Sequence, residues 1–342
     1  MPHAPDYRES FLRELSNYCI LTVLAYSCKS AGLTPPPFRK NYHYIELDEK
    51  KVINLRFNNK LVEQIKVVNP DVICIALDIH YPTRIAAFLL NPHLWKKWVW
   101  WGQIYGRSKN KILNTLKIYL IDKSYGALVY NDSIQLKLET ESKKHLNVLS
   151  FNNSQFSSKN FEFLPNTKNT KLHCLFVGRP QKRKRLELLI DLAKRRQDLI
   201  IRLVGPGMEQ YMKSFSGYEI LELFPSAKED ELNDHFLWSN IVINPGHVGL
   251  LVMNAASHNR AIVIDSKVNH APELILAKET NQFFVDFEDI SAVDKLLYKF
   301  IENPSLYIHK GEMLYKQGIK KYTTEKMAQN HMKMFNEVIN SK

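Results

Sequence analysis

The chain has 342 residues, which is enough for two domains with large buried cores. Hydrophobic residues make up 45% of it and charged residues 24%, as is ordinary for a globular protein. The 47 basic and 35 acidic residues give a formal net charge of +12. This balance favours anionic partners such as nucleotides, sugar phosphates, anionic lipid headgroups or nucleic acid, and it does not choose among them.

The cysteines and the apolar runs narrow the class of protein further. Cys19, Cys28, Cys74 and Cys174 lie far apart in apolar runs and form no C-x-x-C pair. We therefore expect buried free thiols in a reducing compartment and no zinc site. No apolar run reaches the ~18 residues of a membrane span, and the first eight residues lack the apolar core of a signal peptide. The expected location is cytoplasmic, with peripheral attachment to the inner face of a membrane as an open alternative.

The first half of the chain alternates helix and strand patterns. The predicted helices cover residues 7–16, 58–68, 83–90 and 109–122. The predicted strands cover residues 19–26, 71–77, 97–103, 127–130 and 148–151. Such alternation predicts a parallel sheet with helices on both faces.

Residues 152–171 interrupt this alternation. Asn, Ser, Thr and Lys dominate the segment and Pro165 lies inside it, so we interpret it as the interdomain linker. The second half resumes with predicted strands at 172–177, 199–204, 218–223, 240–243 and 261–264. Predicted helices cover 184–196, 207–213, 228–237 and 249–258, continue after Ile290, and end with a helix from about Thr324 to Ile339.

The expected architecture is α/β, with two Rossmann-like parallel-sheet domains facing across a cleft. The predicted boundaries are 1–155 for the N-terminal domain, 156–171 for the linker, 172–322 for the C-terminal domain, and 323–342 for a C-terminal helix that can pack back on the first domain. Ligands of such folds bind in the cleft, at the C-terminal ends of the strands.

Turns in the C-terminal half carry the features of an anion site. Gly178 ends an apolar strand and precedes a dense basic segment that contains Arg179 and Lys184. Gly205 and Gly207 flank a proline after the next strand. Glycine lets the backbone approach a phosphate, and helix N–H groups behind the turn point at it. The two cations make the site suited to a diphosphate, although each turn on its own is also an ordinary one.

Residues 172–273 resemble the donor-binding domain of retaining glycosyltransferases with the GT-B fold, the group 1 or family-4 class. Val177-Gly178-Arg179 and Lys184 fit the V-G-R-x-x-x-x-K motif of that family, and Arg185 stands where a glycine is usual. The segment from Val204 to Gly207 stands where the family carries V-G-x-G-P, and Pro272-Glu273 matches a later P-E.

The family's E-x7-E pair is missing here, because its positions fall on Gly246 and Asn254. A bacterial subgroup that acts in surface polysaccharide assembly is similar in carrying P-G-x-V-G-L at this turn, as residues 245–250 do. The first half resembles the same subgroup more loosely, at Tyr7-Arg8-Glu9 and at Trp101-Gly102.

The resemblance implies roles for individual residues. Arg179 and Lys184 are expected to clamp the donor diphosphate and to stabilise charge on the leaving phosphate. The other expected donor-binding residues are Gly178, Gly205, Gly207, Gly246, His247, Val248, Gly249, Leu250, Asn254 and Glu273. The candidate acceptor-side residues are Tyr7, Arg8, His80 and Gln103, with ordinary loop or ion-pair roles as the alternative. For Lys182, Arg183 and Arg185 we favour a solvated basic helix start.

The implied reaction moves a sugar from a nucleoside-diphosphate sugar to a hydroxyl of a glycan or lipid-linked glycan, with retention. No cofactor or metal is expected, and the sequence has no D-x-D motif. The alternative is an inactive glycan- or nucleotide-binding protein that kept the fold after losing E-x7-E. An epimerase would need carboxylates near the sugar, and we expect no nucleic-acid partner because no recognised module is present.

An aromatic patch remains, formed by Trp95, Trp98, Trp100 and Trp101 with the lysines between them. One interpretation is an interfacial membrane contact near a lipid-linked acceptor. We favour the other, a strand of core residues entered from the end of a helix.

Overall fold

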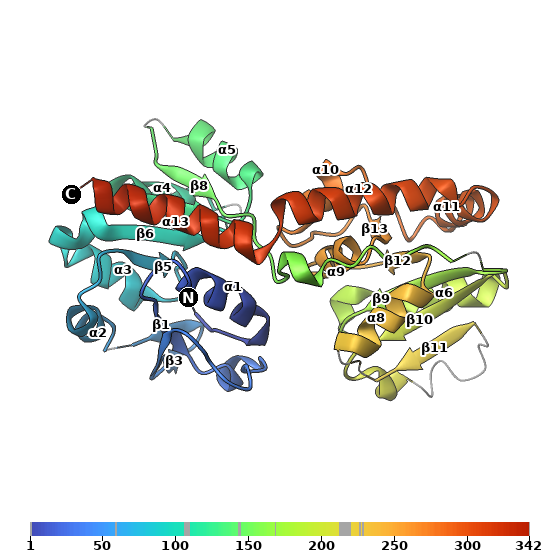
Figure 1. Cartoon of the computed structure of the whole chain (residues 1–342), viewed down its shortest axis with the longest axis horizontal. Helices are drawn as coiled ribbons and strands as arrows, with labels where there is room; N and C mark the ends of the chain where they lie inside the picture. The colour runs from blue at the N-terminus through green and yellow to red at the C-terminus, as the bar shows by residue number, and fades with distance from the viewer. Residues whose placement is uncertain are drawn as a thin grey trace. The chain divides into compact units, whose positions relative to one another are not determined.

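The computed structural model describes residues 2–58, 60–105, 110–142, 145–167, 169–211, 220–225, 227 and 229–341. The chain divides into two compact units (Figure 1). Unit 1 comprises Met1–Ser157 and Thr323–Lys342, and unit 2 comprises Ser158–Tyr322.

Unit 1 is built around a parallel sheet in the order β5-β6-β7-β8. Its strands are β5 (Ile73–Ala76), β6 (Trp98–Gly102), β7 (Gly126–Val129) and β8 (Val148–Ser150). A parallel pair, β1 (Thr22–Tyr26) with β2 (His43–Leu47), and an antiparallel hairpin, β3 (Lys50–Val52) with β4 (Leu55–Phe57), complete the strands described in this unit. The helices are η1 (Asp6–Arg8), α1 (Glu9–Ser16), η2 (Lys29–Ala31), α2 (Leu61–Val68), α3 (Pro82–Leu89), η3 (Pro92–Lys97), α4 (Lys111–Lys123), α5 (Asp132–Glu141) and α13 (Thr324–Asn340).

Strand β6 explains the tryptophan-rich segment. Trp98 and Trp100 are fully buried and Trp101 is 8% exposed, because both faces of this central strand are covered. Phe88 of α3 packs against both Trp98 and Trp100. The interpretation as core residues is therefore confirmed for Trp98, Trp100 and Trp101, whereas Trp95, on η3, is partly exposed.

The last helix, α13, packs on α1 and belongs to unit 1 (Figure 1). Its buried His331 accepts a hydrogen bond from Trp101 Nε1 at 3.0 Å and donates from Nδ1 to Met327 O at 2.7 Å. These bonds require a neutral imidazole, and burial lowers the pKa of His331 to about 4. The helix is thus held to the sheet by a polar contact inside an aromatic cluster.

Unit 2 has a sheet in which, among the described residues, six parallel strands follow the order β11-β10-β9-β12-β13-β14. The strands are β9 (Leu172–Val177), β10 (Leu199–Val204), β11 (Leu221–Phe224), β12 (Ile241–Asn244), β13 (Ala261–Asp265) and β14 (Phe283–Val285). The helices are η4 (Ser158–Asn160), η5 (Lys182–Lys184), α6 (Glu187–Arg195), η6 (Met208–Tyr211), α8 (Glu229–Trp238), α9 (Leu251–Ser257), α10 (Leu274–Glu279), α11 (Ile290–Glu302) and α12 (Ser305–Lys321).

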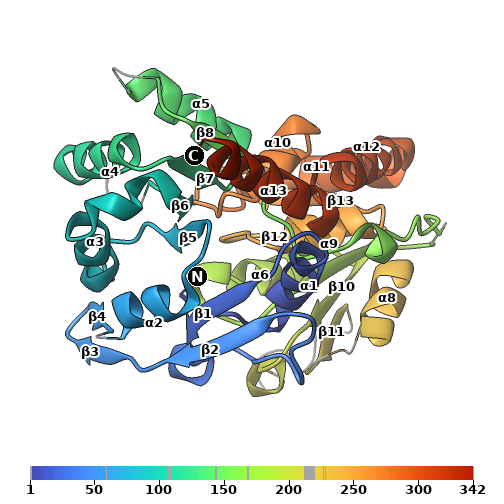
Figure 2. The same cartoon turned by 60° about the vertical axis from the view of Figure 1, so that its left-hand side comes forward.

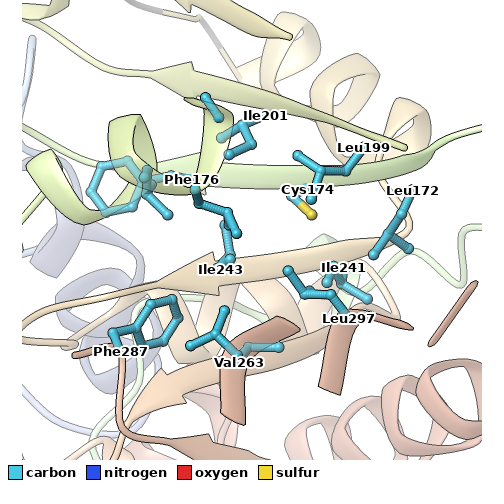
Figure 3. Close-up of a cluster of buried hydrophobic side chains, with 14 of the residues drawn as sticks. Leu172, Cys174, Phe176, Leu199, Ile201, Ile241, Ile243, Val263, Phe287 and Leu297 are labelled. Carbon is cyan, nitrogen blue, oxygen red and sulfur yellow. The ribbon is translucent and has the colours of Figure 1, made fainter. Parts of the chain in front are cut away.

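The core of unit 2 forms where side chains of neighbouring strands meet helix α11 (Figure 3). Cys174 and Phe176 of β9 lie beside Ile243 of β12, and Leu297 reaches the same cluster from α11. Burial raises the pKa of the Cys174 thiol to about 12, so this cysteine is a core residue. All four cysteines are free thiols, with Cys28 and Cys174 buried and the other two partly exposed.

The segment predicted to be a linker is largely part of unit 2. Residues 158–171 fall in this unit, and the buried Arg260 holds them there. Its guanidinium donates to Leu164 O at 3.0 Å and to Pro165 O at 2.9 Å. The hydrogen bonds from Arg260 to these backbone carbonyls hold an irregular segment in place. Its composition alone had indicated a linker between domains.

Both units confirm the prediction of an α/β protein with parallel sheets, and the differences are local. Strands β2, β3, β4 and β14 and helix α5 had not been predicted. The helix predicted from residue 184 begins at Glu187, because Arg185 adopts a left-handed conformation with φ of 54°. Predicted elements at 207–213 and 218–223 extend into residues 212–219, which lie outside the described part of the chain, as do the predicted helix starts at residues 109 and 228.

Candidate active site

The candidate site lies at the carboxyl edge of the unit 2 sheet. Because the strands are parallel, the turns after Val177, Val204 and Asn244 leave the sheet at one edge. The chain order reverses between β9 and β12, and these strands pair only at Cys174↔Ile241 and Leu175↔Val242. The last residues of β9 and β12 therefore do not pair with each other. In open α/β sheets, ligands bind at the place where the strand order reverses in this way.

The glycines of the first two turns are required by the fold itself. Gly178 and Gly205 have φ of 151° and 154°, and a Cβ on Gly205 would lie 2.3 Å from Gly178 O. Gly207 has φ of 93°, and its amide donates to Glu209 Oε2 at 3.1 Å. The glycine after each valine is therefore needed for the close packing of the turns after β9 and β10, independently of any ligand.

Arg185 anchors the basic turn that follows β9. Its guanidinium donates to Asp265 Oδ2 at 3.3 Å and also pairs with Glu288. Asp265, at the end of β13, is fully buried and accepts backbone bonds from Lys267 and Val268. The interpretation of Arg185 as part of a solvated helix start was wrong, because its side chain is only 19% exposed and holds a buried carboxylate. A glycine is usual at this position in the family that the sequence resembles, and glycine adopts the left-handed conformation without strain.

Lys184 lies at the centre of the site. Its ammonium donates to His247 O at 2.7 Å, so within the described residues its hydrogen-bond partner is a carbonyl and not a carboxylate. Burial, together with the positive charges of Arg183 and Arg179, lowers the pKa of Lys184 to about 8. Arg179 is exposed and near enough to act on Lys184. The turn thus concentrates positive charge, and none of the acidic side chains that the structure describes forms an ion pair with Lys184.

The loop after β12 packs directly against this basic turn. The His247 amide donates to Arg183 O at 2.8 Å, and a Cβ on Gly246 would lie 2.4 Å from the same oxygen. Any side chain at position 246 would push the two backbones apart. The first position of E-x7-E is therefore glycine here because the basic turn fills the space that a glutamate would need.

A third segment, between β13 and α10, braces the loop from the other side. His247 Nδ1 donates to Asn269 O at 2.7 Å. His270 Nδ1 accepts from the Val248 amide at 3.1 Å, and His270 Nε2 donates to Asp265 O at 2.7 Å. These bonds require a neutral His270, whose pKa burial lowers. A lone loop histidine gives no sequence signal, so His270 had not been predicted to take part.

The remaining predicted donor-side residues differ in their surroundings. Val248 is fully buried, while Gly249 and Leu250 are partly exposed and lead into α9. Asn254 donates from Nδ2 to Leu250 O at 3.3 Å, a bond within its own helix. Glu273, just before α10, is 8% exposed. Of this loop, the printed contacts bring Gly246 and His247 together with Lys184.

The predicted acceptor-side residues all belong to unit 1. His80 and Gln103 follow β5 and β6, so they leave the sheet at its carboxyl edge, and both are exposed. His80 Nδ1 lies 2.8 Å from Asp78 Oδ1. Arg8 is 8% exposed and donates to Asn153 Oδ1 at 2.6 Å, instead of pairing with the nearby glutamates, whereas Tyr7 is 38% exposed.

The described residues offer neither a metal site nor a membrane-spanning helix. No group of His, Cys, Asp or Glu side chains there is arranged to hold a metal ion. Of the helices that the structure describes, none combines the length and apolarity that crossing a membrane requires.

Residues 158–321 match the model of the family described as "Glycosyl transferases group 1", a range that is nearly coextensive with unit 2. No curated protein matches the sequence.

Solved structures that match the chain share its fold. TarM of S. aureus is 16% identical with a TM-score of 0.58, and the match covers 82% of this chain and 59% of TarM. The chain therefore spans about three fifths of TarM. A glycosyltransferase from Rickettsia africae ESF-5 is 12% identical with a TM-score of 0.71, covering 99% and 97% of the two chains. HepE from Anabaena, in complex with UDP-glucose, is 11% identical with a TM-score of 0.63, covering 100% and 97%. This likeness shows the GT-B fold, with two Rossmann-like domains.

Proposed function

We propose that the chain is a glycosyltransferase that moves a sugar from a nucleoside-diphosphate sugar to a hydroxyl of a glycan or lipid-linked glycan, with retention. Unit 2 would hold the donor, and Arg179 and Lys184 would hold its diphosphate. The match of residues 158–321 to the group 1 family model supports sugar transfer.

The state of Lys184 is the observation that carries the proposal. It is a largely buried ammonium whose pKa is about 8, beside the positive charges of Arg179 and Arg183. At neutral pH such a group is still mostly protonated, but burial makes its charged form less favourable than it is in water, and a bound diphosphate would offset that cost. Its place between β9 and β12 is where a nucleotide would lie in a doubly wound sheet.

In the proposed reaction the bond between the anomeric carbon and the diphosphate oxygen breaks while the acceptor oxygen bonds to the same face of that carbon. The acceptor hydroxyl gives its proton to the departing phosphate oxygen, so no side-chain base takes part. Arg179 and Lys184 stabilise the charge that gathers on the diphosphate. We propose that these cations act without a metal, in keeping with a sequence that has no D-x-D motif.

The relatives suggest the kind of substrate. HepE is seen with UDP-glucose, and a TarM variant is seen with UDP and α-GlcNAc-glycerol. We propose by analogy a UDP-sugar donor and a glycan acceptor for this chain, with the reaction taking place in the cytoplasm.

One observation favours a second candidate, a nucleotide-binding protein without activity. Position 246 cannot hold the first carboxylate of E-x7-E, because a Cβ there would lie 2.4 Å from Arg183 O. The second position is Asn254, whose amide donates to Leu250 O. Tight nucleotide binding without sugar transfer to any acceptor would select this candidate.

The double variant Arg179→Ala with Lys184→Ala tests the proposal. Nucleotide release from a panel of UDP- and GDP-sugars should fall below detection, and calorimetric UDP binding should weaken at least tenfold. The matched control is Lys182→Ala, which removes an exposed cation from the same turn and leaves Arg183, whose charge acts on Lys184. Unchanged transfer by the double variant, or equal losses in both proteins, would refute the assignment.

A further inference from the structure

The loop after β12 contains two consecutive peptide groups that are each held at both ends. Strands β9, β12 and β13 are neighbours in the sheet of unit 2 and lie side by side in Figures 1 and 2. The segments that follow β9 and β13 therefore reach the loop from either side, and both supply hydrogen-bond partners to it.

The first peptide group joins Gly246 to His247. Its carbonyl, Gly246 O, accepts from Asn244 Nδ2 at 2.6 Å, and its amide, on His247, donates to Arg183 O at 2.8 Å. Asn244 is fully buried, and among the described residues its Oδ1 has no hydrogen-bond partner. A flip of this side-chain amide would turn Oδ1 toward Gly246 O. The bond to the loop carbonyl therefore persists although it leaves one buried acceptor unsatisfied.

The second peptide group joins His247 to Val248. Its carbonyl, His247 O, accepts from Lys184 Nζ at 2.7 Å, and its amide, on Val248, donates to His270 Nδ1 at 3.1 Å. The other ring nitrogen of His270 donates to Asp265 O at 2.7 Å, which fixes the tautomer of the imidazole. Because a peptide group is planar and rigid, its rotation would carry His247 O away from Lys184 and the Val248 amide away from His270 together. The place of the Lys184 ammonium thus depends on His270 through a single peptide group.

We propose that neutral His270 is a positioning residue of the donor site, which aligns the loop so that His247 O sets the ammonium of Lys184 where the diphosphate binds. This role rests on the proposed function, because it serves the same diphosphate. Both ring nitrogens of His270 are already bonded within the protein, so His270 acts through the loop and not on the nucleotide.

Donor binding should therefore weaken at acid pH. Protonation of His270 at Nδ1 replaces the acceptor for the Val248 amide with a second donor, and the two N–H groups would then repel. The charged and titratable groups around the ring are His247, whose ring is stacked at 6.3 Å, the Asp265 carboxylate and Lys278 of α10. Burial is the largest influence and lowers the pKa of His270 below the ordinary 6.5. The loop should be released as the pH falls below that value.

Protonation of the neighbouring His247 has the opposite effect on an anion. Its Nδ1 donates to Asn269 O at 2.7 Å, and a protonated imidazole keeps that donor. The added positive charge would strengthen the attraction for a phosphate. A loss of affinity at acid pH therefore reports on His270 and not on His247.

Calorimetric measurement of UDP affinity by the full chain, from about pH 7.5 down to about pH 5, tests this role. The wild type should lose affinity about fivefold across this range, the worth of one hydrogen bond. His270→Asn places an amide oxygen near the position of Nδ1, so it should bind UDP at neutral pH like the wild type and lack the additional loss at acid pH. His270→Leu removes the acceptor and should bind about fivefold more weakly already at neutral pH. Protonation of the nucleotide affects all of these proteins alike.

The matched control is His173→Leu, which removes a half-buried imidazole from the amino half of β9, where Nδ1 lies 3.0 Å from Trp238 O. This variant should bind UDP like the wild type at every pH, even if it unfolds more easily. Equal losses of affinity in His173→Leu and His270→Leu would mean a general loosening of unit 2 and would overturn the proposal. A loss at acid pH that is as large in His270→Asn as in the wild type would do the same.

Hydrogen exchange of the Val248 amide, measured without nucleotide, separates this role from the proposed function. The amide should exchange slowly in the wild type and in His270→Asn, and about fivefold faster in His270→Leu. If the wild type binds no nucleoside diphosphate while this exchange pattern holds, the proposed function fails and His270 remains the residue that holds the loop. Equal exchange in all three proteins would overturn the role of His270 itself.

Discussion

Arg185 allows the strain of a backbone turn to be separated from the ion pair that fixes it. The residue has φ of 54° and holds Asp265 and Glu288. Arg185→Ala and Arg185→Gly remove the same side-chain contacts. They differ in that alanine keeps the cost of the left-handed conformation, whereas glycine does not.

The expected magnitudes follow from these contacts. Loss of the guanidinium leaves Asp265 fully buried, but the carboxylate keeps backbone donors at Lys267, Val268 and Phe287. The cost should therefore be that of a charged hydrogen bond, roughly 1.5–3 kcal/mol for Arg185→Ala. Arg185→Gly should recover about 1 kcal/mol of this through relief of the left-handed strain.

Urea unfolding of the full chain, followed by circular dichroism, measures both variants. The glycine variant should unfold at a higher denaturant concentration than the alanine variant, with the same dependence on denaturant. If the alanine variant is as stable as the glycine variant, the turn is not held in the left-handed conformation and the account of the basic turn is wrong.

Two further results are expected. Gly246→Ala should destabilise unit 2 by about 2 kcal/mol, because its Cβ would meet Arg183 O at 2.4 Å, whereas the nearest atom to a Cβ on Gly249 is 3.6 Å away. Equal melting temperatures for Gly246→Ala and Gly249→Ala would contradict this reasoning. Burial lowers the pKa of His258 and His331 to about 4 from the ordinary 6.5. The folded chain therefore takes up these two protons at a lower pH than the unfolded chain does. Stability should be complete above about pH 6.5 and fall toward pH 4 by up to about 3 kcal/mol per histidine, and denaturant midpoints that stay constant over this interval would argue against neutral buried imidazoles.

The sequence was most informative where local chemistry decides the structure. Apolar runs bounded by glycine placed β9 and β10 to the residue, and periodicity placed α13 within one residue. The missed elements carry little such signal: β3 is exposed along its length, and Leu138 is the one described buried residue of α5. These elements form because tertiary neighbours hold them.

The candidate site shows the same division. Arg179, Lys184 and the loop from Gly246 could be selected from motif spacing, and the structure brings Lys184 to that loop. Arg185 and His270 both bond to Asp265, which lies 80 residues from Arg185 in the chain. No local sequence pattern predicts a partner of this kind. The left-handed conformation at position 185 could also not be predicted, because the residue there is arginine. A glycine at this position would have indicated it.

The most direct test of the diphosphate grip compares the wild type with Lys184→Arg across a pH series. Calorimetry measures the affinity for UDP from neutral pH to about pH 10. Since the pKa of Lys184 is about 8, the wild type should lose affinity as the pH rises above that value, because an uncharged amine no longer attracts phosphate. Lys184→Arg should resist this loss, since a guanidinium stays protonated, and titration of the nucleotide itself affects both proteins alike. Identical pH profiles for the two proteins would show that Lys184 does not hold the diphosphate.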